Sequence, residues 1–189
     1  MPRVTTILSD LRLIYRIDDE AAKARGTAVH LAIRYMLEDR LDWESLDPAI
    51  IGYVKAAQKF CADMEVHPLA IEQAVALPEL GYAGTLDLLC TFGRSNAKAI
   101  VDWSTGSVPV TKGLQMVAYG AARPIGAKPP KQPLPPIGRV AVELRENGTY
   151  LTSIFDVRFW YQDWRAWLGA IALQQWVQRV KARPQGGLQ

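Results

Sequence analysis

The chain has 189 residues, of which 49% are apolar and 22% are charged, and this balance excludes an intrinsically disordered or fibrous protein. Its net charge of +3 permits a polyanionic partner but is too small to indicate one. Two cysteines, Cys61 and Cys90, lie in apolar stretches, which excludes a disulfide framework. No basic-then-apolar leader opens the chain, and no apolar run approaches the ~20 residues of a membrane span. We therefore expect one soluble, cytoplasmic domain over residues 1–189 that does not bind membranes.

The first third of the chain predicts two helices. Residues 4–17 show no clean hydrophobic period and predict only a short lead-in helix or strand. The following stretch, 18–40, begins with acidic residues suited to a helix N-terminus, and its apolar residues share one face: Val29, Ile33, Met36 and Leu37. Asp47 and Pro48 are a capping residue followed by a proline in the first turn, which predicts a second helix. The apolar stripe of that helix comprises Ile50, Val54, Ala57, Cys61 and Met64.

The middle of the chain predicts three strands. Short β-rich segments occupy residues 69–80, 82–92 and 98–105. They are separated by Gly81 and by the turn-like residues 93–98. We expect the second and third segments to pair as a hairpin about that turn.

A helix, a loop and a hairpin are predicted next. Helical character returns over residues 111–122. The proline-dense stretch 123–137 predicts a loop or an extended arm. Residues 139–144 and 150–157 predict a β-hairpin, with Asn-Gly at 147–148 in its bend.

The last predicted element is a helix from about residue 157 to 183 that is rich in tryptophan. Three of its tryptophans share one stripe and the fourth lies slightly off it: Trp160, Trp164, Trp167 and Trp176. Such a stripe more often packs on a sheet than forms an interface. The order helix, helix, three strands, helix, hairpin, helix predicts an α/β fold, with a sheet flanked by helices on both sides and no internal repeat.

Two aspartates interrupt apolar strand segments, Asp87 in GTLDLLC and Asp102 in AIVDWS. In a hairpin about residues 93–98 they would lie nearly opposite each other. Two carboxylates so close in a partly dry site repel one another, so both stay ionised only around a cation. Hard oxygen ligands at an open site suit Mg²⁺ or Mn²⁺. The alternative is that each aspartate merely caps a backbone group or pairs with a basic residue.

Polar residues on two predicted helices complete the set of candidates. His30 lies just off the apolar stripe of its helix, one turn after Gly26. A glycine in mid-helix costs about 1 kcal/mol relative to alanine, which indicates a close approach at that point. A lone histidine in this position is more often a half-buried polar residue than a ligand. Gln115 and Tyr119 are four residues apart on one helix face, where they either pack or contact a nucleic-acid backbone or base.

Four short motifs follow one another along the chain: Gly-Thr-Ala-Val-His at 26–30, Gly-Thr-Leu-Asp at 84–87, Val-Asp-Trp-Ser at 101–104 and Gln-Met-Val-Ala-Tyr at 115–119. In this order, on a helix, two strands and a helix, they resemble the nuclease domain of RecB-type enzymes. That group belongs to the PD-(D/E)XK superfamily, with relatives among phage recombination exonucleases and CRISPR-associated adaptation nucleases. The resemblance covers about residues 20–160. It implies a restriction-endonuclease-like α-βββ-α-β core with a central mixed sheet, here with an extra C-terminal helix.

The resemblance also implies a metal site. His30, Asp87 and Asp102 would be both catalytic residues and ligands of Mg²⁺ or Mn²⁺, and the main-chain carbonyl of Trp103 would be a further ligand. The implied reaction is metal-assisted hydrolysis of DNA phosphodiesters. In such a reaction the metal lowers the pKa of a water and neutralises charge that grows on the phosphate oxygens.

Residues that would contact DNA come partly from the same resemblance. Gln115 and Tyr119 match the helix motif that follows the active-site strands in RecB-like nucleases. Basic residues that can follow a phosphate backbone are spread over the chain, although ordinary surface charge explains most of them individually. They are Arg25, Arg34, Lys112, Arg123, Lys128 and Lys131.

Ser104 occupies the position of a lysine in that family, in a pattern such as Asp-Tyr-Lys-Thr-Gly. The ammonium of that lysine orients the attacking water and stabilises charge on the phosphate, whereas a serine carries no charge. By analogy with the loss of one electrostatic donor, the rate cost is on the order of 10²–10³. Three explanations stay open: an engineered Lys→Ser variant, a natural protein whose cation comes from another element such as Lys112 or Lys98, or a protein that binds DNA without cutting it.

Two functions from different classes follow. The first is a Mg²⁺- or Mn²⁺-dependent deoxyribonuclease acting on the ends of single- or double-stranded DNA, because a short single domain has no extra module for reading bases. The resemblance implies an exonuclease of phage or mobile-element recombination and repair, acting as a monomer in a bacterial or phage-infected cytoplasm, with a recombination protein among its partners. The alternative is a catalytically silent module that keeps the fold to bind DNA or a partner protein.

Overall fold

Aspartate caps define the two long helices of the N-terminal part. The computed structural model of the chain describes residues 1–14, 19–129 and 135–182. The lead-in element is a short helix, α1 (Val4–Asp10). The side chain of Asp19 accepts hydrogen bonds from two N–H groups in the first turn of α2 (Glu20–Leu37), and Asp47 caps α3 (Pro48–Asp63) in the same way. Both predicted helices are confirmed.

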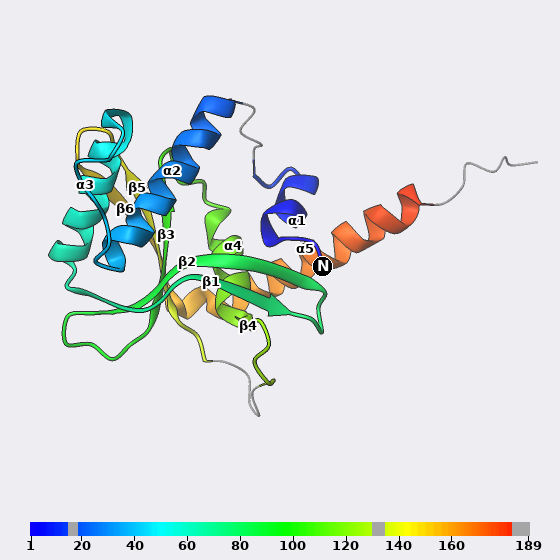
Figure 1. Cartoon of the computed structure of the whole chain (residues 1–189). Helices are drawn as coiled ribbons and strands as arrows, with labels where there is room; N and C mark the ends of the chain where they lie inside the picture. Colours follow the sequence, from blue (N-terminus) through cyan, green and yellow to red (C-terminus); the bar gives the residue numbers. More distant parts are fainter. Residues whose placement is uncertain (15–18, 130–134, 183–189) are drawn as a thin grey trace, which may run out of the picture.

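One mixed sheet of six strands forms the centre of the molecule (Figure 1), in the order β4-β1-β2-β3-β5-β6. β3 and β5 run parallel, and every other neighbouring pair is antiparallel. The predicted α/β fold with helices on both faces of a sheet is therefore confirmed. The strands are β1 (Val66–Leu77), β2 (Tyr82–Phe92), β3 (Ala99–Ser104), β4 (Arg123–Pro124), β5 (Gly138–Leu144) and β6 (Tyr150–Phe155).

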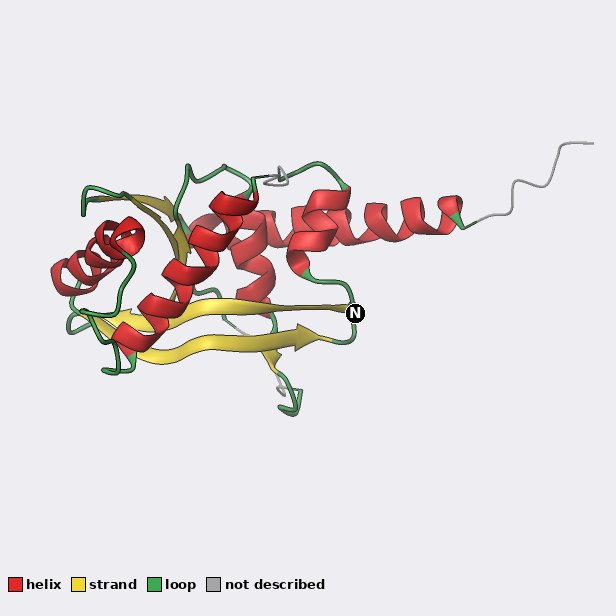
Figure 2. Cartoon of the chain, turned by 45° about the horizontal axis from the view of Figure 1, so that its top comes forward, coloured by secondary structure: helices red, strands yellow, loops and turns green. Residues whose placement is uncertain are grey.

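Two hydrophobic cores lie on opposite faces of this sheet. The first contains α2 and α3 and the strand residues Leu88, Val101 and Trp103. The second contains α1, α4 (Lys112–Ala121) and α5 (Trp160–Lys181). In Figures 1 and 2 the C-terminal part of α5 extends beyond the sheet. None of the described helices is long and apolar enough to cross a membrane.

The tryptophans of α5 divide between the core and the surface. Trp160 and Trp167 are buried, and the ring of Trp167 meets Tyr82 of β2 edge to face with centroids 5.2 Å apart. Trp176 is 52% exposed, which agrees with its place off the predicted stripe. α5 begins at Trp160 because a 3₁₀ turn, η1 (Val157–Phe159), comes first.

The described part of the proline-dense stretch 123–137 is a loop, as predicted, except at its first two residues. Arg123 and Pro124 form the short strand β4, which pairs with β1 at the edge of the sheet. A proline is tolerated there because an edge strand needs no N–H on its open side. Arg123 also makes two hydrogen bonds to Glu79, at 2.9 and 2.7 Å. The part of this stretch that contains Lys131, and residue 183 at the end of the predicted last helix, lie outside the described residues.

Candidate metal centre and active site

In β1 and in β2 the alternation of side chains between the two faces of the sheet is interrupted, and the two interruptions lie next to each other. Leu86 packs in the core on the α4 face, whereas Leu88, two residues later, packs in the core on the α2 and α3 face. In β1 the same change occurs between Ile71 and Val75. Residues two or four apart in a regular strand share a face, so each strand contains one irregular residue between these positions.

Glu72 and Asp87 lie at this break, and both side chains turn toward α2. Glu72 has a φ of 47°, a left-handed conformation that is rare for a residue other than glycine and that clusters at functional sites. The pairing register of β1 and β2 is the same on both sides of the break, so the two acidic residues stand opposite each other. The paired irregularities thus deliver two carboxylates to one face of the sheet.

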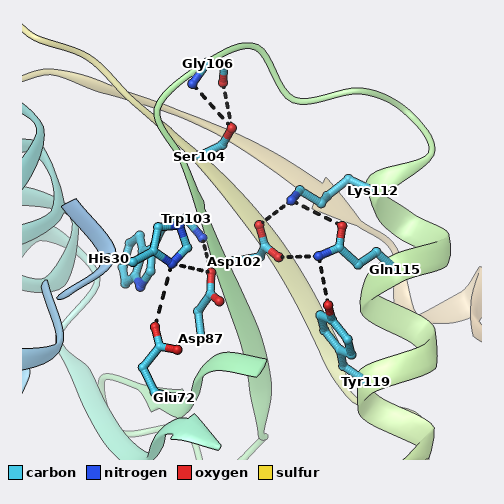
Figure 3. A network of polar contacts seen from close by, with 10 residues as sticks. All are labelled: His30, Glu72, Asp87, Asp102, Trp103, Ser104, Gly106, Lys112, Gln115 and Tyr119. Atoms are coloured by element: carbon cyan, nitrogen blue, oxygen red, sulfur yellow. Dashed lines mark hydrogen bonds and ion pairs between the residues drawn. The ribbon is translucent and has the colours of Figure 1, made fainter. Parts of the chain in front are cut away.

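His30 of α2 completes a group of three possible metal ligands with these carboxylates (Figure 3). Its Nδ1 lies 3.7 Å from Glu72 Oε1 and 3.6 Å from Asp87 Oδ2. One ligand atom from each of the three residues falls within 4.8 Å of the others, the spacing needed to hold a single ion. The side chains of His30 and Glu72 are 32% and 26% exposed, so the group is open to solvent.

The side chains of this group raise one another's pKa or oppose its rise. Burial lowers the pKa of His30, but its contact with Glu72 and the charge of Asp87 outweigh burial and raise this pKa to about 9. Burial, followed by the charge of Asp102, raises the pKa of Asp87 to about 7, against the opposing effect of His30. Two carboxylates therefore crowd one imidazole at short range, an arrangement that a bound cation stabilises.

Asp87 also links β2 to β3. The paired residues of the two strands end at Leu88 with Val101, which confirms the predicted hairpin. Beyond that pair, the N–H of Trp103 donates to Asp87 Oδ2 at 2.9 Å, so the carboxylate takes the place of a backbone acceptor. The ring of Trp103 is buried against Phe60, edge to face at 5.6 Å. The Trp103 carbonyl as a metal ligand stays a prediction.

Asp102 points to the opposite face of the sheet, toward α4, because its neighbours on β3 face α2 and α3. Its side chain is almost fully buried, and its Oδ2 lies 2.7 Å from Lys112 Nζ in an ion pair. Gln115 Nε2 donates to Asp102 Oδ1 at 3.3 Å and to the Tyr119 hydroxyl at 3.2 Å. Asp102 therefore pairs with a basic residue, which is the alternative that the sequence left open for it. Asp102 as a metal ligand stays a prediction that requires it to exchange Lys112 for a metal ion.

This second set of residues is closed to solvent. Gln115 and Tyr119 are 9% and 5% exposed, which favours packing over direct contact with DNA. Burial lowers the pKa of Lys112, but the charge of Asp102 more than offsets burial and the pKa of Lys112 is raised. Gly84 makes room for this arrangement, since a Cβ there would lie 2.4 Å from the ring of Tyr119.

Ser104 lies at the end of β3, and its hydroxyl is engaged in a local turn. Its Oγ donates to the carbonyl of Gly106 at 2.9 Å and accepts from the Gly106 N–H at 3.4 Å. Figure 3 shows this hydroxyl directed away from the carboxylates of Asp87 and Asp102. The structure therefore provides no charge at the position of the family's lysine.

An open groove of about 1020 Å³ runs along α2 and contains the exposed side of the three-residue group. Its lining is rich in cationic and hydroxyl side chains. These are Arg3, Lys23 and Arg34 among the cations and Thr5, Thr27, Ser104 and Thr105 among the hydroxyls. A cavity of about 280 Å³ on the other face of the sheet is mostly apolar and contains no acidic residue among its described lining.

Among the described basic residues predicted to follow DNA, Arg34 lines the groove, where it also pairs with Glu38 at 2.9 Å. Arg25 lies over the ring of Tyr53, and Arg123 is at the β4 edge of the sheet. Two further cations of the groove, which were not predicted, come from the residue before α1 and from the first turn of α2. They are Arg3 and Lys23, the latter paired with Glu20 at 2.6 Å.

Gly26 faces the groove rather than another part of the chain. A Cβ at this position would meet only Thr105 Oγ1, at 3.8 Å, which is ordinary van der Waals contact. The predicted close approach is therefore not a contact within the protein among the described residues. The glycine instead widens the groove beside His30.

Chemically, the arrangement places the imidazole of His30 and the carboxylate of Glu72 in the lining of a groove with cationic walls, and the carboxylate of Asp87 lies next to them. Such a donor set suits a divalent ion, and such walls suit a polyanion. No protein-family model matches the chain, and no curated protein matches it in sequence.

Proposed function

We propose that the protein is a metal-dependent deoxyribonuclease of the RecB-like, PD-(D/E)XK type, with one Mg²⁺ or Mn²⁺ ion held by His30, Glu72 and Asp87. The observation that carries this proposal is the convergence of these side chains, from α2, β1 and β2, within 4.8 Å of one another in an open groove. Two hard oxygen ligands with one imidazole fit Mn²⁺ and Mg²⁺. When bound, the ion would supply a water of lowered pKa and positive charge next to the phosphate.

The walls of the groove support DNA as the substrate. Arg3, Lys23 and Arg34 offer positive charge, and the hydroxyl groups of the lining offer hydrogen bonds to phosphate oxygens. Among the described lining residues the aromatic one is Trp103, which is buried and cannot stack on a base. The groove therefore suits the sugar-phosphate backbone, and cleavage would depend little on sequence.

The reaction balances with water alone. The water oxygen forms a bond to phosphorus, and the bond from phosphorus to one ester oxygen breaks. One proton of the water goes to the leaving oxygen, so the products are a phosphomonoester and a hydroxyl group. No electrons are transferred and no co-reactant is consumed.

Action as an exonuclease in phage or mobile-element recombination is part of the same proposal. It is supported by the motif order and by a groove without a base-reading surface. A monomer acting in the cytoplasm, with a recombination protein as a partner, follows from the same resemblance.

A catalytically silent DNA-binding module is the second candidate function. One observation favours it: Asp102 is paired with Lys112, and the Ser104 hydroxyl is engaged with Gly106. In that case the groove would bind DNA, and the three-residue group would bind a metal without cleavage.

The test is an assay of the unchanged protein on end-labelled linear single- and double-stranded DNA, with Mg²⁺, Mn²⁺ or EDTA. We expect cleavage that requires the metal and that is lost in Asp87→Asn and in Glu72→Gln. Glu143→Gln is the matched control, because Glu143 is a strand carboxylate whose contact is with Arg145 and neither residue lines the groove.

Three results separate the candidates. Cleavage that depends on metal and on Asp87 supports the nuclease. DNA binding without cleavage by any metal supports the silent module. Cleavage that survives both Asp87→Asn and Glu72→Gln would show that the metal site has been assigned to the wrong residues.

A further inference from the structure

We propose that the free edge of β6 joins two copies of this chain into a two-fold symmetric dimer, in which the two sheets are continuous through an antiparallel β6–β6 pair. β6 (Tyr150–Phe155) is the last strand of the sheet, and within the described residues no strand pairs with its outer side. The proposal concerns how the chain assembles and does not depend on the nuclease function. It differs from the monomer that the resemblance to RecB-like nucleases implies.

The two edges of the sheet differ in how they are protected against pairing. At the opposite edge, the short strand β4 contains Pro124. The part of β1 that lies beyond β4 contains Pro68, and its register shifts between Pro68 and Ala70. β6 has the sequence Tyr-Leu-Thr-Ser-Ile-Phe, with no charge, no proline and no register shift against β5. Prolines, charges and bulges are the usual protection of an edge strand, so β6 is the edge that is open to pairing.

The backbone groups that β6 offers at its free edge belong to Tyr150, Thr152 and Ile154. The N–H of Gly138, at the start of β5, donates to the carbonyl of Lys98 on the β3 side, so the even-numbered residues of β5 face β3 and the odd-numbered ones face β6. The odd-numbered residues of β5 pair with the odd-numbered residues of β6, whose N–H and C=O groups therefore point to β5. The even-numbered residues of β6 direct these groups away from the sheet.

The three outward residues of β6 are self-complementary. A two-fold axis through Thr152, perpendicular to the sheet, places Thr152 opposite Thr152 of the second copy and Tyr150 opposite Ile154, with the α2 faces of both copies on the same side. All three residues then take part in hydrogen-bonded pairs. Thr–Thr pairs and pairs of an aromatic with a β-branched residue are favourable across strands. Ile154, which is 74% exposed in the single chain, is covered by the Tyr150 ring of the second copy.

The exposed apolar surface continues from β6 into the turn and helix that follow it. Among the described residues, the densest run of exposed large apolar side chains lies within residues 151–161. Its members are 46% to 74% exposed, and they are Leu151, Ile154, Val157, Phe159 and Tyr161. A stable specific interface buries about 1,200 Å² or more in total, so an edge pair needs such a continuation beside it.

The charges at the two ends of β6 do not oppose a second copy. Arg145 and Glu146 precede the strand, and Asp156 and Arg158 follow it. Antiparallel pairing therefore brings one acidic and one basic residue of each copy next to one acidic and one basic residue of the other. Because these ends carry both signs, they attract each other or are neutral, and no cluster of like charge forms.

The experiment compares the unchanged protein with Ile154→Lys, Thr152→Pro and Leu69→Lys, all in EDTA. Sedimentation velocity over a range of protein concentrations measures the mass, which is 21.0 kDa for one chain. Ile154→Lys places a charge in the proposed interface, and Thr152→Pro removes an N–H that β5 does not use. Leu69→Lys is the matched control, because Leu69 is a strand residue that is 52% exposed on β1, away from β6.

Hydrogen exchange of the β6 amides supplies a second readout at single residues. Dilution of the unchanged protein from dimer to monomer should speed exchange at Tyr150, Thr152 and Ile154 at least tenfold, because these N–H groups lose their partners. The odd-numbered residues of β6 stay bonded to β5, and their exchange should change less than threefold.

We expect the unchanged protein and Leu69→Lys to sediment with twice the mass of one chain. Ile154→Lys and Thr152→Pro should each raise the Kd of the dimer at least tenfold. A monomer at every concentration overturns the proposal and leaves the β6 edge to a strand of another protein. A dimer that persists unchanged in both β6 variants also overturns it, since the interface then lies elsewhere. Neither of these results affects the proposed nuclease function.

Discussion

The polar groups on the two sides of β3 both contain carboxylates, but the carboxylates have different partners. On the α4 side, Asp102 is buried and its charge is balanced by Lys112 at 2.7 Å. On the α2 side, Glu72 and Asp87 share one imidazole at 3.6 to 3.7 Å, and Glu72 and that imidazole line an open groove. The first group is complete without a ligand, and the second is not.

This difference shows why burial alone is a poor guide to a binding site. Asp102 is the more buried aspartate, yet its partners come from the protein itself. Asp87 receives one N–H from Trp103 and otherwise faces other acidic groups and His30. A site that binds a cation needs carboxylates of the second kind, which face one another without a lysine or arginine between them.

Breaking the ion pair between Lys112 and Asp102, on the α4 side of β3, should have the largest effect on the free energy of unfolding. Lys112→Met leaves Asp102 buried without its cation, and we expect the free energy of unfolding to fall by about 3–5 kcal/mol. Lys112→Met/Asp102→Asn should recover most of that loss because no charge stays buried. Urea denaturation of both variants measures the difference, and a loss below about 1 kcal/mol in the single variant would mean that water reaches Asp102.

A bound metal should stabilise the folded protein only through His30, Glu72 and Asp87, on the α2 side of β3. At a free Mn²⁺ concentration 100 times its Kd, we expect the free energy of unfolding to rise by about 2.7 kcal/mol in the unchanged protein and in Asp102→Asn. At the same concentration Asp87→Asn should gain less than about 1.4 kcal/mol, the value that corresponds to a tenfold loss of Mn²⁺ affinity. Thermal unfolding with Mn²⁺ and with EDTA checks this, and an equal shift in Asp87→Asn would place the ion elsewhere.

A methyl group added at Gly84 should disturb only the packing around Tyr119, on the α4 side of β3. Its Cβ would lie 2.4 Å from the Tyr119 ring, so Gly84→Ala must displace the ring or the strand. We expect a loss of about 2 kcal/mol, typical of an overpacked core. The Mn²⁺-dependent stabilisation should persist in this variant. Its disappearance would show that the two sides of β3 are mechanically coupled.

Much of the fold follows from local patterns in the sequence. The acidic start of α2, the cap at Asp47, the β2–β3 hairpin and the Asn-Gly bend before β6 all appear where periodicity and turn chemistry place them. β4 was not predicted, because a two-residue edge strand containing a proline has no periodic signal.

The candidate site was only half predictable for a related reason. His30 and Asp87 interrupt apolar patterns and so attract attention, whereas Glu72 lies in a strand that is partly exposed and shows no such contrast. Its left-handed backbone and the matching break in β2 bring it to His30, and neither is visible in a regular alternation. The partnership of Asp102 with Lys112 depends on how α4 packs on the sheet, which spacing alone does not determine.

The same methyl group at Gly26 should act in the opposite direction, because this glycine faces the open side. A Cβ there meets only Thr105 Oγ1 at 3.8 Å, so Gly26→Ala removes the cost of a glycine within α2 without a clash. We expect the free energy of unfolding to rise by about 1 kcal/mol, as measured in urea.

The gain in stability at Gly26 should come with weaker binding of DNA, because the methyl group projects into the groove beside His30. Fluorescence anisotropy with a labelled oligonucleotide, in EDTA to prevent cleavage, measures that affinity. If Gly26→Ala is more stable than the unchanged protein but binds DNA with the same affinity, the DNA strand does not pass between α2 and Thr105. We expect the free energy of unfolding to rise in Gly26→Ala and to fall in Gly84→Ala. Both changes have the same cause, because protein atoms fill the space beside Gly84 on the α4 side of β3 and leave the space beside Gly26 on the α2 side free.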